Sequence, residues 1–290
     1  MEIREFTGNL QHTTTRLVAT NEKITTIKKN GKVLEQVRQS KGTGFFFDFG
    51  IAEIEHHLKV IVTNRHVVEN AIELYFVMNE SNALGHRSDI QHHLFMGEED
   101  LNRYVFYHPD PNVDLCIIDI TDIFETYLRA GTTLFMRALS FEDVPSKEGL
   151  QDLKALEEVV MIGYPAGLWD EHNNLPIMRT GDTSSHIAYD YLGEEDFMVN
   201  IPAYHGSSGS PLVKLVDRPL VRDGENIIQH SCLLLGIQKE IPEVRNLDGS
   251  IYTNLGVFVK SYRLYDFLPL VRAAYQEEIN EILRSRQQNQ

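Results

Sequence analysis

The hydrophobic residues of this chain occur in short runs that are rich in β-branched and aromatic side chains and are separated by polar or glycine-containing turns. Runs of this kind, without sustained helical periodicity, predict β-strands. They form one group before residue 120 and a second group after residue 158, so we predict an all-β protein built from two halves. The predicted strands are 45–47, 60–62, 74–77, 104–106, 115–118, 159–162, 197–201, 212–216, 233–237 and 257–259.

The polar stretch from residue 140 to 156 separates the two groups and is the predicted connection between them. We therefore assign residues 1–140 to the first half, residues 141–262 to the second half, and residues 263–290 to a C-terminal segment. Apolar residues in that segment recur at three- and four-residue steps, which predicts a helix that closes against the second half. Its apolar face consists of Leu268, Val271, Tyr275, Ile279 and Ile282.

Length and composition narrow the class of protein. A chain of 290 residues with 42% apolar residues can bury two cores. The formal net charge of -15 argues against an extended phosphate-binding surface, so we expect no nucleic-acid partner. The start of the chain has no apolar leader, and no run of about 18 apolar residues occurs anywhere. We therefore expect no membrane partner and a cytoplasmic location.

The cysteines and paired histidines give little sign of metal or disulfide chemistry. Cys116 and Cys232 both lie in apolar runs, which predicts buried core residues and fits a reducing compartment. The pairs 56–57 and 92–93 are adjacent histidines, and neighbouring side chains of a strand point to opposite faces. We therefore expect neither a metal site nor any other cofactor.

The most informative segment is 205–211, in which Ser208 stands between glycines and Pro211 opens an apolar run. A Gly-Ser-Ser-Gly string by itself is usually a surface loop, so a nucleophilic role needs a base and an orienting carboxylate elsewhere. His66 follows the predicted strand 60–62, and Asp114 directly precedes the predicted strand 115–118. The chain order His, Asp, Ser is the one found in the chymotrypsin template. Asp110 is a nearby competitor, which we interpret as a turn residue.

Five segments extend this likeness beyond three residues. They are 42–45, 63–67, 110–115, 162–165 and 206–213, in that order. Their sequences and spacing resemble those of trypsin-like serine peptidases of the chymotrypsin fold, most closely bacterial and Deg/HtrA-type domains, over about residues 40–262. The resemblance implies two packed antiparallel β-barrels with a C-terminal helix, and a serine endopeptidase that acts on protein or peptide substrates. We expect no PDZ module after the protease region.

The resemblance also assigns roles to individual residues. Ser208 would attack the peptide carbonyl, His66 would take its proton, and Asp114 would orient the imidazole. The backbone amides of Gly206 and Ser208 would form the oxyanion hole. Because two barrels would meet at the site, the residues of the triad would come together across a crevice.

Departures from the family pattern concern activation and specificity. Ser207 stands where secreted relatives have an acidic residue that pairs with a newly cut N-terminus, so no activation cleavage is implied. Ser210 replaces a glycine of the turn. By counting, Pro202 lies at the base of the pocket for the substrate side chain, which predicts a preference for apolar or small residues. His205 would touch substrate beside the scissile bond, although an exposed loop histidine is an equally good interpretation.

Two other functions are compatible with parts of the sequence. The first is a catalytically silent trypsin-like module that binds peptides without cutting them. The second is an α/β-hydrolase that uses Ser208 with His230 and either Asp217 or Asp223, but this would need a helix after the serine, where the sequence predicts a strand. A regulatory protein partner is also an expectation, because related enzymes can hold the oxyanion loop collapsed until a partner binds.

Overall fold

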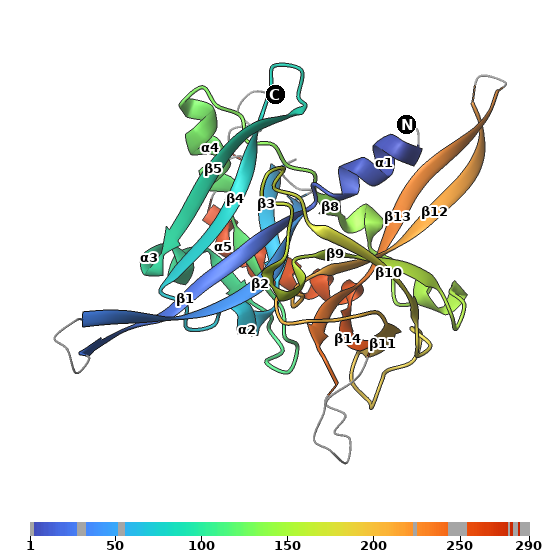
Figure 1. Cartoon of the computed structure of the whole chain (residues 1–290). Coiled ribbons are helices and arrows are strands. Elements are labelled where there is room, and N and C mark those ends of the chain that lie inside the picture. The colour runs from blue at the N-terminus through green and yellow to red at the C-terminus, as the bar shows by residue number, and fades with distance from the viewer. Residues whose placement is uncertain are drawn as a thin grey trace, which may run out of the picture.

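The computed structural model describes residues 3–27, 33–51, 56–222, 225–242, 254–277, 279–280 and 284. The prediction of an all-β protein is confirmed, because strands of two sheets that lie side by side are the main regular structure and the helices between them are short (Figure 1). All ten predicted strands are found within observed ones, apart from small differences at their ends.

The first sheet has eight strands in the order β5-β4-β1-β2-β3-β7-β6, and β8 pairs in parallel with β2. The short helix α3 (Glu98–Tyr104) links the two edge strands, β5 and β6. The strands are β1 (Thr14–Ile27), β2 (Val33–Ile51), β3 (His56–Thr63), β4 (Glu73–Ser81), β5 (Arg87–Gly97), β6 (Val105–Tyr107), β7 (Cys116–Asp119) and β8 (Leu139–Ser140).

The second sheet is a closed barrel in the order β10-β11-β14-β13-β12-β9. Its neighbouring strands are antiparallel, including the pair β9 and β10 that closes the circle. The hairpins β1–β2 and β12–β13 project from opposite sides of the molecule (Figure 1). The barrel strands are β9 (Glu158–Gly163), β10 (Ile177–Thr183), β11 (Asp196–Asn200), β12 (Pro211–Arg222), β13 (Glu225–Glu240) and β14 (Leu255–Lys260).

Short helices occupy connections between strands and the two ends of the described chain. They are α1 (Ile3–Leu10), α2 (Arg65–Val68), α4 (Thr121–Arg129), α5 (Leu268–Ala274) and the 3₁₀ turns η1 (Phe141–Asp143), η2 (Gly149–Asp152), η3 (Pro165–Gly167) and η4 (Ser261–Phe267). Within the described residues, no helix has both the length and the apolar character needed to cross a membrane.

Strands β1, β5, β8 and β10 were not predicted from the sequence. In β1 only residues 17–19 form an apolar run, and threonine, asparagine and charged residues fill much of the rest. This strand is held by pairing with β2 on one side and β4 on the other. Its partners, and not its own hydrophobic pattern, therefore explain why it is extended.

The largest core cluster joins the two halves. It contains Phe47 and Ile117 of the first sheet, Ile162 and Val259 of the barrel, and Phe267 of η4. A second cluster lies within the first sheet and a third within the barrel. Because the shared cluster would be exposed if the halves separated, hydrophobic burial holds them in one arrangement.

The predicted C-terminal helix is present, but its packing differs in part from our expectation. Val271 and Ile279 are buried in the shared core as predicted, and Ile282 lies outside the described residues. Tyr275 donates a hydrogen bond from its hydroxyl to Asp119 at the end of β7, in the first sheet. The segment therefore packs against both halves, because residues of both halves form the shared core.

Both cysteines are free and buried, as the sequence predicted. Burial raises the pKa of the Cys116 thiol well above its ordinary value and raises the pKa of Cys232 to about 12. Both thiols are therefore protonated at neutral pH and pack as small apolar groups.

Candidate active site

His66 lies on the one-turn helix α2, which begins two residues after β3 ends. Its ring atom Nδ1 is 2.5 Å from Oδ2 of Asp114, and its backbone N–H donates to Oδ1 of the same carboxylate at 3.0 Å. An ionised carboxylate can only accept hydrogen bonds, so Nδ1 donates in this contact, and in the neutral ring Nε2 keeps its lone pair. The predicted base and carboxylate are therefore together.

Asp114 lies in the loop that enters β7. The side-chain amide of Asn64 donates to its backbone carbonyl at 2.7 Å, and Asn64 itself is fully buried directly before α2. The same two segments are thus joined through the backbone of Asp114 and through its side chain. This double connection fixes the carboxylate relative to the imidazole.

The turn that carries Ser208 has a backbone that requires glycine at two positions. Gly206 has φ +89° and Gly209 has φ +84°, in the region that L-residues with a Cβ disfavour. A Cβ on Gly206 would lie 2.7 Å from the carbonyl oxygen of Tyr164, and one on Gly209 would lie 2.1 Å from that of Thr43. The glycines therefore supply both the backbone angles and the space that this turn needs.

Ser208 and α2 approach each other across strand β2. The backbone N–H of Thr43 donates to the carbonyl of Ser208 at 2.8 Å. A Cβ on the neighbouring Gly42 would lie 3.2 Å from this same carbonyl oxygen and 2.7 Å from the side chain of Val67, which follows His66 in α2. Ser208 and the helix of the base therefore pack against the same glycine. Among the described residues, no hydrogen bond links the Ser208 hydroxyl to His66.

The amides expected to form an oxyanion hole have free N–H groups. The carbonyl of His205 accepts from the N–H of Ala166 at 2.7 Å, and the carbonyl of Gly206 accepts from Thr43 Oγ1 at 2.9 Å. Because the peptide bonds are trans, the Gly206 N–H points away from Ala166. Within the described part of the chain, the N–H groups of Gly206 and Ser208 have no hydrogen-bond acceptor.

Ser210, which replaces a glycine of the family pattern, fits into the core of the turn. Its side chain is fully buried and donates to Thr43 Oγ1 at 3.2 Å. Gly163 makes room for it, because a Cβ there would lie 2.1 Å from the Ser210 hydroxyl oxygen. The departure from the pattern is therefore accommodated by a second glycine on β9.

Arg179 of β10 holds the segment before Ser208, and sequence reasoning missed it. Its guanidinium donates from Nη1 to the carbonyl of Pro202 and from Nη2 to the hydroxyl of Ser207 at 3.1 Å. Burial lowers the pKa of Arg179 to about 10, and no carboxylate pairs with it among the described residues. A single arginine in a short mixed strand carries no sequence signal that would have identified this role.

The two predicted substrate-binding residues lie on the same segment. His205 is exposed. Pro202 is partly buried and lines a cavity of about 700 Å³ in the barrel, together with residues of β9, β10 and β12. The lining of this cavity includes none of the three triad residues. A role for Pro202 and His205 in binding substrate stays a prediction.

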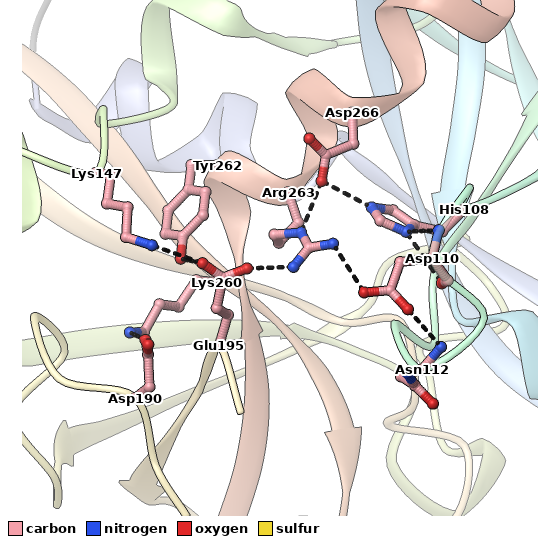
Figure 2. Close-up of polar contacts among 10 residues, drawn as sticks. All are labelled: His108, Asp110, Asn112, Lys147, Asp190, Glu195, Lys260, Tyr262, Arg263 and Asp266. Carbon is pink, nitrogen blue, oxygen red and sulfur yellow. Dashed lines mark hydrogen bonds and ion pairs between the residues drawn. The ribbon is translucent and has the colours of Figure 1, made fainter. Parts of the chain in front are cut away.

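A cluster of charged residues anchors the loop that carries Asp114 (Figure 2). At its centre, Arg263 of η4 donates from Nε to Asp266 at 2.7 Å and from Nη1 to Glu195, and its Nη2 lies 3.5 Å from Asp110. Asp110 also accepts from the backbone N–H of Asn112 at 3.0 Å, which makes it the turn residue that we predicted.

His108 is the second link in this cluster. Its side chain is fully buried, with Nε2 3.1 Å from Asp266 and Nδ1 3.1 Å from the backbone N–H of Asp110. The ring can donate to the carboxylate of Asp266 from Nε2 while Nδ1 accepts from the N–H of Asp110. The N–H of His108 also donates to the carbonyl of Leu115 at 3.0 Å, which closes the loop around Asp114.

Glu195 connects the cluster to the barrel. Burial would raise the pKa of this carboxyl, but hydrogen bonds from Lys147, Tyr262 and Arg263 outweigh it and lower the pKa to about 2. Lys147 Nζ and the Tyr262 hydroxyl each lie 2.7 Å from it (Figure 2). The loop of the first sheet, the C-terminal segment and the barrel thus meet at one group of ions.

The structure contradicts the α/β-hydrolase alternative. Asp217 and His230 do pair, at 2.7 Å, but they are cross-strand neighbours on the hairpin β12–β13. Asp223 lies outside the described residues. Ser208 is followed by β12 and not by a helix, so the turn required for such an enzyme is missing.

A family model that covers most of the two sheets places the chain in a known class. Over residues 42–221, more than half of its length, the chain matches the family described as trypsin-like peptidase domain, and it therefore belongs to that family. No curated protein sequence matches it.

Several solved structures resemble the chain at low identity. One is a serine-to-alanine variant of the HtrA-type protease AlgW with a decapeptide (12% identity, TM-score 0.48), which covers 90% of this chain. The chain spans 64% of the length of that protease. HL collagenase has 12% identity and a TM-score of 0.48, with coverage of 91% of this chain and 94% of the other. An inactivated protease paralogue of the scabies mite has 13% identity and a TM-score of 0.42, with coverage of 93% and 94%.

Proposed function

We propose that this protein is a serine endopeptidase that hydrolyses peptide bonds in protein or peptide substrates through His66, Asp114 and Ser208. The observation that carries the proposal is the double contact of Asp114 with His66, at 2.5 Å to the ring and 3.0 Å to the backbone N–H. A carboxylate in this position holds the imidazole in the tautomer that a general base needs. Membership of the trypsin-like peptidase family supports the same reaction class.

In the first step, Nε2 of His66 takes the proton of the Ser208 hydroxyl while its oxygen attacks the carbonyl carbon of the substrate. The electron pair of the carbonyl bond moves to its oxygen. The free N–H groups of Gly206 and Ser208 would donate to this oxyanion, and the loss of one such donor typically slows a reaction about 100- to 1000-fold.

In the second step, the imidazolium of His66 gives its proton to the leaving amine as the carbon–nitrogen bond breaks, and an ester on Ser208 is left. Asp114 stabilises the imidazolium throughout. Water then attacks the ester with His66 again as base, which releases the carboxylic acid product and restores the Ser208 hydroxyl.

The segment before Ser208 supports cleavage after apolar or small side chains. Pro202 offers no carboxylate to an arginine or lysine of the substrate, and its carbonyl already accepts from Arg179. The positive charge of Arg179 opposes a second cation nearby. Efficient cleavage after arginine in a peptide library would contradict this preference.

A fluorophosphonate probe tests the proposal directly, because it forms a covalent adduct with an activated serine. We expect labelling of the wild-type protein, none of Ser208→Ala, and a large loss in His66→Ala. Labelling should also fall at acidic pH, since protonated His66 cannot accept the serine proton. No adduct on a folded wild-type protein would contradict an active endopeptidase.

One observation favours a second candidate, a catalytically silent trypsin-like module that binds peptides. Among the described residues, the Ser208 hydroxyl makes no hydrogen bond with His66. Active enzymes can also show long catalytic contacts before substrate binds. If the protein binds peptides but forms no fluorophosphonate adduct, whether or not peptide is added to the labelling reaction, the silent module is supported.

A further inference from the structure

A polar cavity of about 410 Å³ adjoins His66 on the side of the first sheet. Strands β1 and β2 and the end of α2 contribute its walls. Its lining residues are Asn21, Arg38, Ser40, His66, Glu69 and Asn70. The cavity therefore shares the proposed catalytic base but none of the segment 202–208.

Hydrogen bonds fix the wall of this cavity. The Ser40 hydroxyl donates to Oδ1 of Asn21 at 3.1 Å, and Nδ2 of Asn21 donates to the backbone carbonyl of Glu69 at 3.0 Å. These contacts join β1, β2 and the residue that follows α2. The polar surface next to His66 is thus held in place before any ligand arrives.

Among the described residues, one cation of the cavity has no counter-ion. The carboxylate of Glu69 pairs with Arg65, whose Nη2 and Nε lie 2.9 Å and 3.0 Å from Oε1. Arg38 is exposed and, within the described part of the chain, forms no ion pair. In a chain of net charge -15, an unpaired arginine beside the catalytic histidine is an unusual local charge.

The position of the cavity relates it to one half of a substrate. The free amides of Gly206 and Ser208 lie on the barrel side and would hold the scissile carbonyl. The leaving amine must then face His66, which gives it a proton. Arg38 lies on β2, upstream of Thr43, whose N–H bonds to Ser208. The cavity is therefore reached by residues that follow the scissile bond.

We propose that Arg38 is a specificity-determining residue that selects peptides with an aspartate or glutamate shortly after the scissile bond, an inference that rests on the proposed function. A guanidinium offers two parallel N–H groups to a carboxylate, and Ser40 and Asn70 add neutral polar groups beside it. Because Arg38 is exposed, the preference is modest, about twofold to fivefold in kcat/KM over the neutral amide.

The test is digestion of a diverse peptide library, with the new amino termini identified by mass spectrometry. The proteins compared are wild type, Arg38→Gln, Arg38→Glu and Lys41→Gln. Lys41 is also exposed and lies on β2, three residues from Arg38 and so on the opposite face of the strand. The substitution Lys41→Gln therefore removes one positive charge from the same strand without changing the cavity.

We expect acidic residues to be enriched after the cleaved bond with wild type and with Lys41→Gln. Arg38→Gln should show no such enrichment, and Arg38→Glu should instead favour lysine and arginine at these positions. All four proteins should still form the fluorophosphonate adduct, because Arg38 does not touch the reacting atoms.

Two results would overturn the inference alone, with the probe still forming its adduct. One is the absence of acidic enrichment, or its persistence in Arg38→Glu. The other is an equal loss in Lys41→Gln, which would show a general effect of charge and not a contact in the cavity. Failure of the probe to label any of the folded proteins would instead overturn the proposed function together with this inference.

Discussion

At the scale of single residues, the proposed chemistry depends on a backbone that only glycine can adopt without strain. Gly206 has φ +89°, and a Cβ at this position would lie 2.7 Å from the carbonyl oxygen of Tyr164. Its N–H is also one of the two free donors beside Ser208. Conformation, space and hydrogen bonding therefore converge on one residue.

We expect Gly206→Ala to slow fluorophosphonate labelling by about 100- to 1000-fold, the typical effect of losing one oxyanion donor, because the peptide must rotate to escape the Tyr164 carbonyl. Gly193→Ala is a matched control, since Gly193 has φ +85° but no atom within 4 Å of a Cβ. It should lose only about 1–2 kcal/mol of stability from the backbone angle and keep its labelling rate. Equal rates for both variants would contradict the role of Gly206.

At the scale of elements, the position of Asp114 depends on segments that are distant in sequence. Its loop is tied to α2 through Asn64 and to η4 through Asp110 and His108. The η4 segment therefore takes part in shaping the site although it contributes no reacting group. We interpret Asp110 as a positioning residue that acts through Asp114.

Asp110→Asn keeps the size of the side chain but weakens its contact with Arg263. We expect slower labelling and a midpoint of the labelling-versus-pH curve that moves to lower pH by a few tenths of a unit. The midpoint moves to lower pH because a displaced Asp114 stabilises the imidazolium of His66 less, so the ring is protonated only at a lower pH.

Lys147→Gln provides the control for Asp110→Asn. Lys147 also belongs to the cluster, but it contacts Glu195 and lies away from the loop of Asp114 (Figure 2). The pH curve of this variant should coincide with that of wild type. If the two variants shifted it equally, the cluster would have a purely structural role.

At the scale of the whole molecule, two kinds of interaction join the halves. The apolar core shared by the first sheet, the barrel and η4 supplies non-directional burial. Arg263 bridges the halves, because its guanidinium contacts Asp110 of the first half and Glu195 of the second. Directional contacts of this kind fix the orientation in which the two halves meet.

The cluster makes part of the stability depend on acidity. The folded-state pKa of Glu195, about 2, lies below its ordinary value of 4.5, so its contribution is complete above about pH 4.5 and is lost as the pH falls towards 2. We expect Glu195→Gln to lower the free energy of unfolding at pH 7 by on the order of 2–3 kcal/mol. The difference from wild type should shrink to near zero at pH 2, as measured by urea denaturation. Glu194→Gln, which changes the exposed neighbour of Glu195, is the control. A stability difference that stays constant with pH, or an equal difference in Glu194→Gln, would contradict this account.

The strands with a clear hydrophobic pattern could be predicted from the sequence, and those held by their neighbours could not. Residues 60–62 and 212–216 lie in strands because apolar side chains there favour burial on a sheet. Strand β1 is extended because β2 and β4 supply its hydrogen bonds, and no local pattern encodes that pairing. The contact of the C-terminal segment with Asp119 was missed for the same reason.

By itself, the sequence determined the all-β class, the two groups of strands, the buried cysteines and the residues that carry the family motifs, because these depend on residue type and spacing along the chain. Only the tertiary structure decided that Arg179 holds Ser207, that Arg263 reaches Asp110 across 153 positions, and that Arg38 lines a cavity beside His66. Such contacts join side chains that are remote in sequence. Their energies depend on distance, burial and neighbouring charge, which exist only once the chain has folded.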